Sequence, residues 1–288
     1  MLPVLGDIRP WADPALTQIN RRPAHVPLSG FHRRSLDGAW SLEMFEHPDK
    51  VPATALTGER PAAVNVEVPG NWTMQELGGF VDLPHYTNVQ MPFDGPPPRL
   101  PDRSATGVYR RTFTISAGWV KRRTILHIGG AESVHAVYVN GRLAGYGTDS
   151  RLPSEYEIGQ LLTRGRNELA VVVVRYSAQS YVEDQDDWWM AGLHRSVWLE
   201  SRPPIHIADL PVTNTYDPAT GAGSIEATTE IDFGGAPQPG WTVSSSLTNP
   251  SGRQVGRGRT TGVPRLGARP WVLGGFRVAR RGEVRGGV

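Results

Sequence analysis

Four carboxylates gather within a short stretch of the sequence, YVEDQDDWWMAGLHR, which covers residues 181–195. The acids are Glu183, Asp184, Asp186 and Asp187, and two tryptophans, Trp188 and Trp189, follow them directly. Residues of these types at this spacing are compatible with a catalytic acid pair, a cation site, a sugar-binding surface or a solvated acidic loop. The neighbouring residues and the rest of the chain help to decide among these four possibilities.

The catalytic acid pair is the least supported of the four. Glycosidases place two carboxyl groups about 5–9.5 Å apart on opposite sides of the scissile bond, and burial raises the pKa of one of them. Asp184 and Asp186 could reach that separation on an extended loop, but adjacent acids on one loop do not provide two different environments. A Ser/His/Asp hydrolase is not indicated either, because the sequence has no G-x-S-x-G motif.

A hard cation or a sugar fits the stretch better. Zinc is not expected, because the chain has no cysteine and the nearest histidine is the isolated His194. Carboxylate oxygens suit Na⁺, Mg²⁺ or Ca²⁺. The indoles, a methionine and Leu193 beside the acids favour polyol recognition, since a carboxylate accepts hydroxyl hydrogen bonds and an aromatic face covers the C–H surface of a sugar. The residue types alone leave the solvated loop open.

The elements that must position these residues are short β-strands. Alternating apolar residues predict strands at 107–115 and 122–128, and a further strand is predicted at 195–201. Residues 167–176 are apolar on both faces, as expected of a strand in the middle of a sandwich, and 134–147 is predicted to be a hairpin that turns at Asn140-Gly141. The best of the weak helical signals lies at 154–165. Many short strands with Gly and Pro turns predict an all-β fold, an antiparallel jelly-roll sandwich.

Two long loops interrupt this pattern, at residues 77–106 and 177–192. Long loops on a rigid sandwich usually carry function. The acidic stretch lies in the second loop. A polar patch at residues 85–88 lies in the first, and by itself such a patch is more typical of hydrogen bonding within a loop than of a binding site.

Composition shifts divide the chain into four segments. They are an extended N-terminal arm at 1–34, a jelly-roll domain at 35–203, an incomplete immunoglobulin-like sandwich at 204–260 and an Arg/Gly-rich tail at 261–288. The arm has no periodic face, so we expect it to dock on a partner surface rather than fold alone. The tail is interpreted either as disordered or as an out-of-frame translation.

The overall composition excludes several functional classes. A net charge of +2 does not indicate the strong positive field that attracts nucleic acid or an anionic membrane surface. Zero cysteines, no signal peptide and no apolar run of membrane-spanning length predict a cytoplasmic location.

Several collinear motifs resemble the N-terminal part of lac-type β-galactosidases, members of glycoside hydrolase family 2. The motifs are WADPALTQINRRPAH (11–25), RSLDGAW (34–40), VPGNWTMQ (68–75), YTNVQMPF (86–93), NGRLAGYGTDSRLPSEYEI (140–158), GRNELAVVVVRYS (165–177) and YVEDQDDWWMAGLHRSVWL (181–199). The resemblance implies a galactose-binding-like jelly roll followed by part of an immunoglobulin-like domain. It also implies that the catalytic glutamates and a magnesium site lie on a barrel further along a longer, homo-oligomeric parent chain.

The resemblance assigns roles to two residues. Asp186, the second Asp of the EDQD motif, matches a residue that contacts galactose and ligates sodium. Asn88, in YTNV, matches a residue that reaches into the same pocket. It assigns no role to Glu183 or Asp184, which we expect only to hold the loop.

The implied function is the N-terminal part of a retaining β-galactosidase, which hydrolyses terminal β-D-galactosides, with no catalytic residue in this chain and no activity of the chain alone. The alternative from another class is a stand-alone, non-catalytic carbohydrate-binding or structural module.

Overall fold

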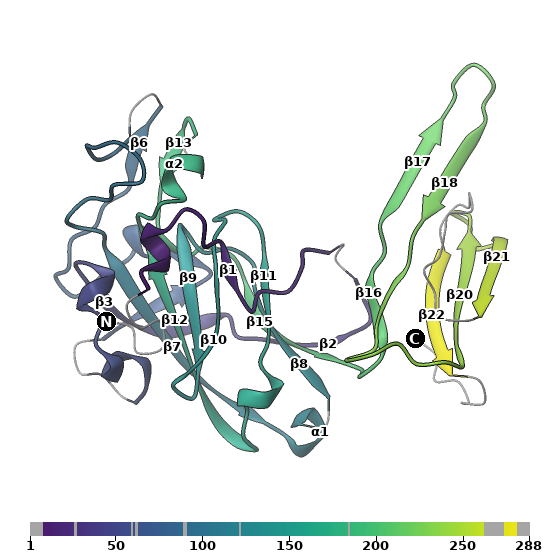
Figure 1. Ribbon diagram of the computed structural model, residues 1–288, viewed down its shortest axis with the longest axis horizontal. Coiled ribbons are helices and arrows are strands. Elements are labelled where there is room, and N and C mark those ends of the chain that lie inside the picture. The colour runs from purple at the N-terminus through teal and green to yellow at the C-terminus, as the bar shows by residue number, and fades with distance from the viewer. Residues whose placement is uncertain are drawn as a thin grey trace. The chain divides into compact units, whose positions relative to one another are not determined.

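The computed structural model describes residues 8–25, 28–58, 60, 63–88, 91–120, 122–183, 185–261 and 274–280 (Figure 1). The chain divides into two compact units. We name them the jelly-roll unit, residues 1–23 and 32–201, and the C-terminal unit, residues 24–31 and 202–288.

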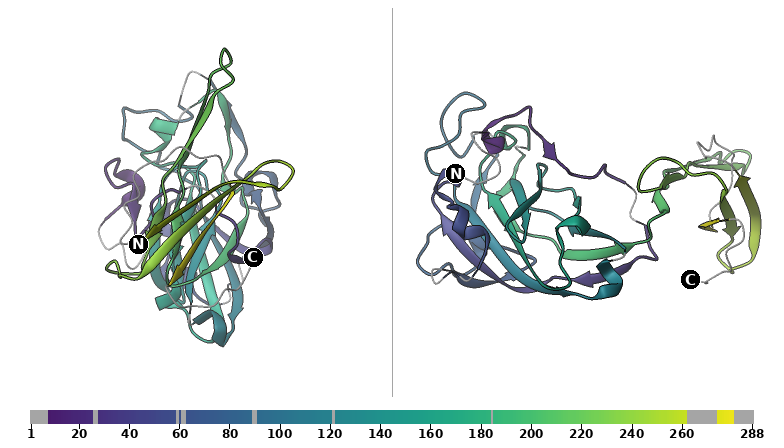
Figure 2. Two further views of the ribbon diagram at one scale, coloured as in Figure 1. Left: turned by 90° about the vertical axis from the view of Figure 1, so that its right-hand side faces the viewer. Right: turned by 60° about the horizontal axis from the view of Figure 1, so that its bottom comes forward.

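The jelly-roll unit contains two main sheets, which Figure 2 shows as two curved layers. The larger sheet has the order β1 (Gln18–Ile19), β10 (Arg142–Gly147), β9 (Val134–Val139), β12 (Gly165–Val174), β7 (Thr106–Ile115), β3 (Gly38–Phe45) and β4 (Val64–Val68). The smaller sheet has the order β11 (Ser154–Glu157), β8 (Arg123–Ile128), β15 (Val197–Arg202) and β2 (His32–Ser35). The strands of the larger sheet pair antiparallel throughout. The prediction of an all-β antiparallel fold is confirmed.

Strand β12 is buried on both faces, as its continuous apolar run predicts. Val171 and Val173 belong to the main core between the sheets. Val172 belongs to a second core on the other face, together with Trp11, which is only 2% exposed. Because Trp11 covers its own sheet, the expectation that the whole arm docks on a partner surface is wrong for this residue.

The hairpin turn between β9 and β10 has the predicted backbone. Asn140 and Gly141 have φ angles of 51° and 74°, as a type I′ turn requires. The helix prediction for 154–165 is wrong. Residues 154–157 form β11, and only Gly159–Leu161 (η5) make a 3₁₀ turn. The reason is the alternation at the start of this segment, which buries Tyr156 and pairs the strand with β8.

The helices of the jelly-roll unit are short. They are η1 (Pro10–Ala12), η2 (Pro48–Lys50), η3 (Ala53–Leu56), η4 (Trp72–Met74), η5, α1 (Ala117–Val120) and α2 (Ser180–Glu183). Two small ribbons join loops, β6 (His85–Thr87) with β13 (Asp187–Trp189) and β5 (Gly70–Asn71) with β14 (Gly192–Leu193). Over the described residues, no helix has the length and apolar character needed to cross a membrane.

The C-terminal unit is also built of antiparallel pairs. They are β16 (His206–Asp209) with β19 (Glu230–Asp232), β17 (Val212–Tyr216) with β18 (Gly223–Ala227), and β20 (Trp241–Thr248) with both β21 (Gln254–Thr261) and β22 (Gly274–Arg280).

Strand β22 lies within the segment 261–288, for which the sequence predicts a disordered or out-of-frame tail. Over residues 274–280 the structure differs from that prediction. An edge of β20 is available there, and main-chain pairing with it requires no particular side chains. The remainder of the tail, from residue 262 to 273 and from 281 onward, lies outside the described residues.

Candidate functional site

The two long loops meet at one end of the jelly-roll unit. Strand β6 of the first loop pairs antiparallel with β13 of the acidic loop (Figure 1). In this pairing Tyr86 lies opposite Trp188. The helix α2 immediately precedes this ribbon in the acidic loop. The fold therefore joins the two loops that the sequence singles out.

A buried ion pair anchors the ribbon to the end of β12. Arg175 follows β12 directly, and its guanidinium contacts the carboxylate of Asp82 in the first loop. It also donates to the carbonyl oxygens of Leu83, at 2.8 Å, and Trp189, at 3.2 Å. The other oxygen of Asp82 accepts the indole N–H of Trp72 at 2.7 Å. Because a buried charge needs such partners, this arrangement holds both loops in one position.

Asp186 is exposed beside the ribbon. Its Oδ1 accepts a hydrogen bond of 2.6 Å from the hydroxyl of Tyr86. This bond raises the pKa of Tyr86. The ring of Tyr86 lies 5.6 Å from that of Trp188, centroid to centroid, and the two side chains are 50% and 52% exposed. A carboxylate therefore stands next to an accessible aromatic surface.

Asn88 and Asp186 flank the same end of the ribbon. The last pair of the ribbon is Thr87 with Asp187; Asn88 follows Thr87 in the first loop, and Asp186 precedes Asp187 in the acidic loop. Both residues are exposed. The two residues predicted to bind sugar thus come from loops far apart in sequence and flank the last pair of one ribbon.

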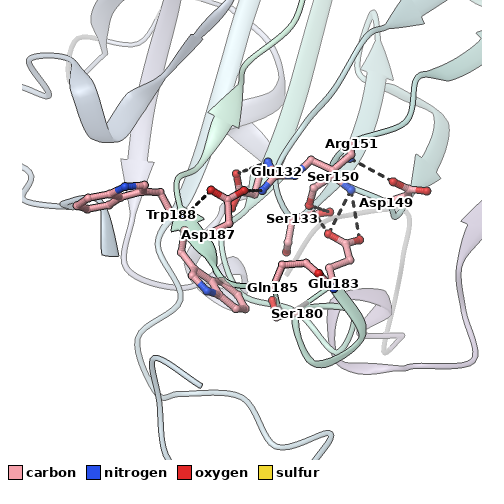
Figure 3. Close-up of a pocket in the computed structure, with 11 residues that line it drawn as sticks. Glu132, Ser133, Asp149, Ser150, Arg151, Ser180, Glu183, Gln185, Asp187 and Trp188 are labelled. Carbon is pink, nitrogen blue, oxygen red and sulfur yellow. Dashed lines mark hydrogen bonds and ion pairs between the residues drawn. The ribbon is translucent and has the colours of Figure 1, made fainter. Parts of the chain in front are cut away.

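Glu183, another acid of the stretch, holds the loop in place. Glu183 accepts hydrogen bonds from the backbone N–H of Ser150, at 3.2 Å, and from its hydroxyl (Figure 3). Burial raises the pKa of Glu183. It therefore ties the acidic loop to the turn after β10. Asp184 lies outside the described residues.

A pocket of about 240 Å³ lies beside this stretch, between Glu183 and a network that the sequence did not reveal. Arg151 contacts Asp187 and the buried Glu132, each at 3.3 Å (Figure 3). Glu132 also accepts the backbone N–H of Met190 at 3.1 Å, and burial raises its pKa. Glu132 and Arg151 were missed because only the fold brings them to the loop.

At Asp186 the described residues offer a cation one carboxylate oxygen rather than a cluster of ligands. The described residues contain no group of three or more His, Cys, Asp or Glu side chains that could hold a metal. One exposed carboxylate, with Oδ1 already engaged by Tyr86, leaves Oδ2 to serve as a single oxygen ligand.

Comparison with known proteins agrees with this fold. The family model for "Glycosyl hydrolases family 2, sugar binding domain" matches residues 33–203. The chain is 39% identical to the β-galactosidase of Erwinia tasmaniensis over 224 residues, which cover 73% of this chain and 21% of that protein. It is 40% identical over 225 residues to that of Aeromonas hydrophila, covering 72% and 22%. The chain therefore spans about a fifth of the length of these curated relatives.

Solved structures share the fold at lower identity. A β-glucuronidase from Bifidobacterium dentium superposes with a TM-score of 0.62 at 20% identity, over 88% of this chain and 43% of that one. A putative β-galactosidase from Bacteroides fragilis gives 0.59 at 18% identity, over 87% and 35%. The resemblance predicted from the motifs is confirmed: this chain belongs to glycosyl hydrolase family 2 and carries its sugar-binding domain.

Proposed function

We propose that this chain is the part of a β-galactosidase that supplies one wall of its galactoside-binding site. The observation that carries the proposal is the hydrogen bond between Tyr86 and Asp186, which holds a carboxylate beside the exposed indole of Trp188. The β-galactosidases that are 36–40% identical to the chain support the choice of substrate.

Asp186 binds rather than reacts in this proposal. A carboxylate oxygen accepts a galactosyl hydroxyl, and the amide of Asn88 can donate to or accept from another. The exposed face of Trp188 covers the C–H surface of the sugar. Asp186 would also hold a sodium ion, which supplies charge for orienting a sugar hydroxyl when bound.

The chemistry would reside elsewhere in the parent enzyme. Retaining hydrolysis requires a nucleophilic carboxylate and an acid/base carboxyl about 5–5.5 Å apart. We expect both on a barrel domain, together with the magnesium site, in a cytoplasmic homo-oligomer. Orientation and acid/base catalysis contribute most of the barrier lowering, so the present chain alone should not cleave galactosides.

The experiment compares catalysis with binding. The purified chain is incubated with nitrophenyl β-galactoside, and amide shifts of the β6–β13 ribbon are followed by NMR while galactose is added. We expect no nitrophenol release and weak or no galactose binding, because one wall of a pocket gives few contacts. Release that co-purifies with the chain would contradict the proposal. Tight saturable binding would instead favour the stand-alone carbohydrate-binding module.

A further inference from the structure

The carboxylate of Asp186 accepts a hydrogen bond from Tyr86, and the residue that follows it has a support of its own. Asp186 lies at the tip of a short turn, because the backbone N–H of Asp187 donates to the carbonyl oxygen of Gln185 at 2.8 Å. The side chain of Asp187 forms an ion pair with Arg151 at 3.3 Å (Figure 3). A contact that holds Asp187 therefore also holds the turn that presents Asp186.

The ion pair between Arg151 and Asp187 does not stand alone. Both side chains are exposed, and an exposed pair by itself contributes little, because water screens the charges and both side chains lose freedom. The other nitrogen of the guanidinium, however, lies 3.3 Å from the carboxylate of Glu132, whose side chain is only 7% exposed. This inner contact holds the guanidinium in the position from which it reaches Asp187.

Glu132 is itself fixed by the strand that leaves the ribbon. Its backbone N–H donates to the carbonyl oxygen of Gly192 at 3.2 Å, as part of an antiparallel bridge. Its side-chain Oε1 accepts the backbone N–H of Met190 at 3.1 Å, which leaves Oε2 for Arg151. Main chain and side chain of Glu132 thus hold the segment directly after β13.

The backbone of Arg151 is fixed as well. Its N–H donates to Oδ1 of Asp149 at 3.1 Å, in a side-chain-to-backbone turn. The preceding residue, Ser150, donates to the carboxylate of Glu183. Glu183 and Asp187, which lie before and after the site carboxylate, are therefore tied to two consecutive residues of one turn.

We propose that Glu132 and Arg151 are positioning residues for the sugar site, which act through Asp186 rather than on the sugar. The inference rests on the proposed function of Asp186 and extends it to two residues outside the long loops. Groups that orient a binding residue commonly affect a site almost as much as the residue itself. The competing explanation is that the pair only stabilises the fold, which predicts no change in the environment of Asp186 when the pair is lost.

Arg151→Met in the isolated chain distinguishes the two explanations through the pKa of Tyr86, measured by NMR of ¹³C-labelled tyrosine. Loss of a nearby positive charge alone would raise a tyrosine pKa, whereas loss of the hydrogen bond to Asp186 lowers it. We expect the Tyr86 pKa to fall toward the ordinary tyrosine value. Arg166→Met, at an exposed arginine of the same unit, should leave it unchanged. A raised or unchanged Tyr86 pKa in Arg151→Met would overturn the proposal.

Glu132→Gln, made in the proposed full-length enzyme, tests the consequence for the substrate. The amide keeps an oxygen for the N–H of Met190 and removes the charge that holds Arg151. We expect kcat/KM for nitrophenyl β-galactoside to fall about tenfold. Glu67→Gln, at an exposed glutamate of β4, is the control and should leave it unchanged. The amide spectrum of the isolated chain checks that both variants fold.

The double variant Glu132→Gln/Asp186→Asn separates positioning from an independent effect. If Glu132 acts through Asp186, the double variant should be as active as Asp186→Asn alone. A further tenfold loss would overturn the proposal. If Asp186→Asn is itself fully active, the proposed function fails, and the Tyr86 pKa in Arg151→Met still shows whether the pair holds Asp186.

Discussion

The hydroxyl of Tyr86 lies 2.6 Å from Oδ1 of Asp186, although 100 positions separate the two residues in the sequence. This bond joins the two long loops of the jelly-roll unit at the point where an exposed aromatic surface meets a carboxylate. It gives Asp186, an exposed member of a run of acids that resembles a solvated loop, a defined hydrogen-bond partner.

Asp186→Asn, made in the proposed full-length enzyme, should lower kcat/KM by roughly one to two orders of magnitude. A hydrogen bond to a charged group contributes about 1.5–3 kcal/mol, and the variant loses the charge that holds both sugar and cation. Kinetics with and without Na⁺ measure the effect. Asp217→Asn, at an exposed turn of the C-terminal unit, is the control. If Asp186→Asn keeps full activity and the same sodium dependence, the acidic stretch is only a solvated surface loop and Asp186 does not bind the sugar.

The same substitution should act on Tyr86 in the isolated chain. The hydrogen bond to Asp186 raises the pKa of Tyr86, so Asp186→Asn should bring that pKa down toward the ordinary tyrosine value. Titration of ¹³C-labelled tyrosine by NMR reports it directly. A Tyr86 pKa that does not move would mean that the bond is not populated in solution.

Removing the anchor of the loops should destabilise the unit. Arg175→Met leaves the carboxylate of Asp82 buried without its main partner and should lower the free energy of unfolding by about 3–5 kcal/mol. The nearby Arg103, 3.7 Å from Asp82, would offset part of this loss. The double variant Arg175→Met/Asp82→Leu should regain much of the stability. Urea unfolding measures all three, and a double variant no better than the single one would contradict the pairing.

Two tryptophans, one buried and one exposed, can be compared to test whether the N-terminal arm packs on its own unit. Trp11→Ala should lower the free energy of unfolding by about 3–5 kcal/mol, because its side chain is 2% exposed against the second core. Trp188→Ala, at 52% exposure, should change it by about 0.5 kcal/mol or less. Chemical denaturation of both variants provides the comparison. Equal stability would mean that the N-terminal arm does not pack on its own unit in solution.

His135 should make the unit sensitive to acid. Burial lowers its pKa to about 3, while the unfolded chain has the ordinary value near 6.5. Between these values the unfolded state binds more protons, so stability is present above about pH 6.5 and falls by about 1.4 kcal/mol per unit as the pH drops toward 3.

His135→Gln should flatten that slope. The amide can keep a hydrogen bond to Tyr156, whose hydroxyl lies 2.9 Å from the imidazole. His32→Gln, at an exposed histidine, should leave the slope as it is. The free energies of unfolding of both variants, measured across this pH range, test the prediction. An unchanged slope in His135→Gln would show that His135 is not buried in its neutral form.

The sequence by itself determined the features that depend on short-range patterns. Alternation of apolar residues predicts strands because successive side chains point to opposite faces, and Asn140-Gly141 predicts a turn because both residues tolerate positive φ. The acidic stretch and the polar patch at Asn88 were also visible, since residue types and motifs are read directly from the chain.

Tertiary structure decided how these parts meet. Residues 154–157 become a strand because β8 offers a partner and the core accepts Tyr156, which a local helical signal cannot reveal. The pairing of Thr87 with Asp187, which joins the two long loops, and the hydrogen bonds that hold Glu183 against Ser150 depend on contacts between distant segments. Such contacts form only when the whole sandwich closes, so no window of the sequence contains them.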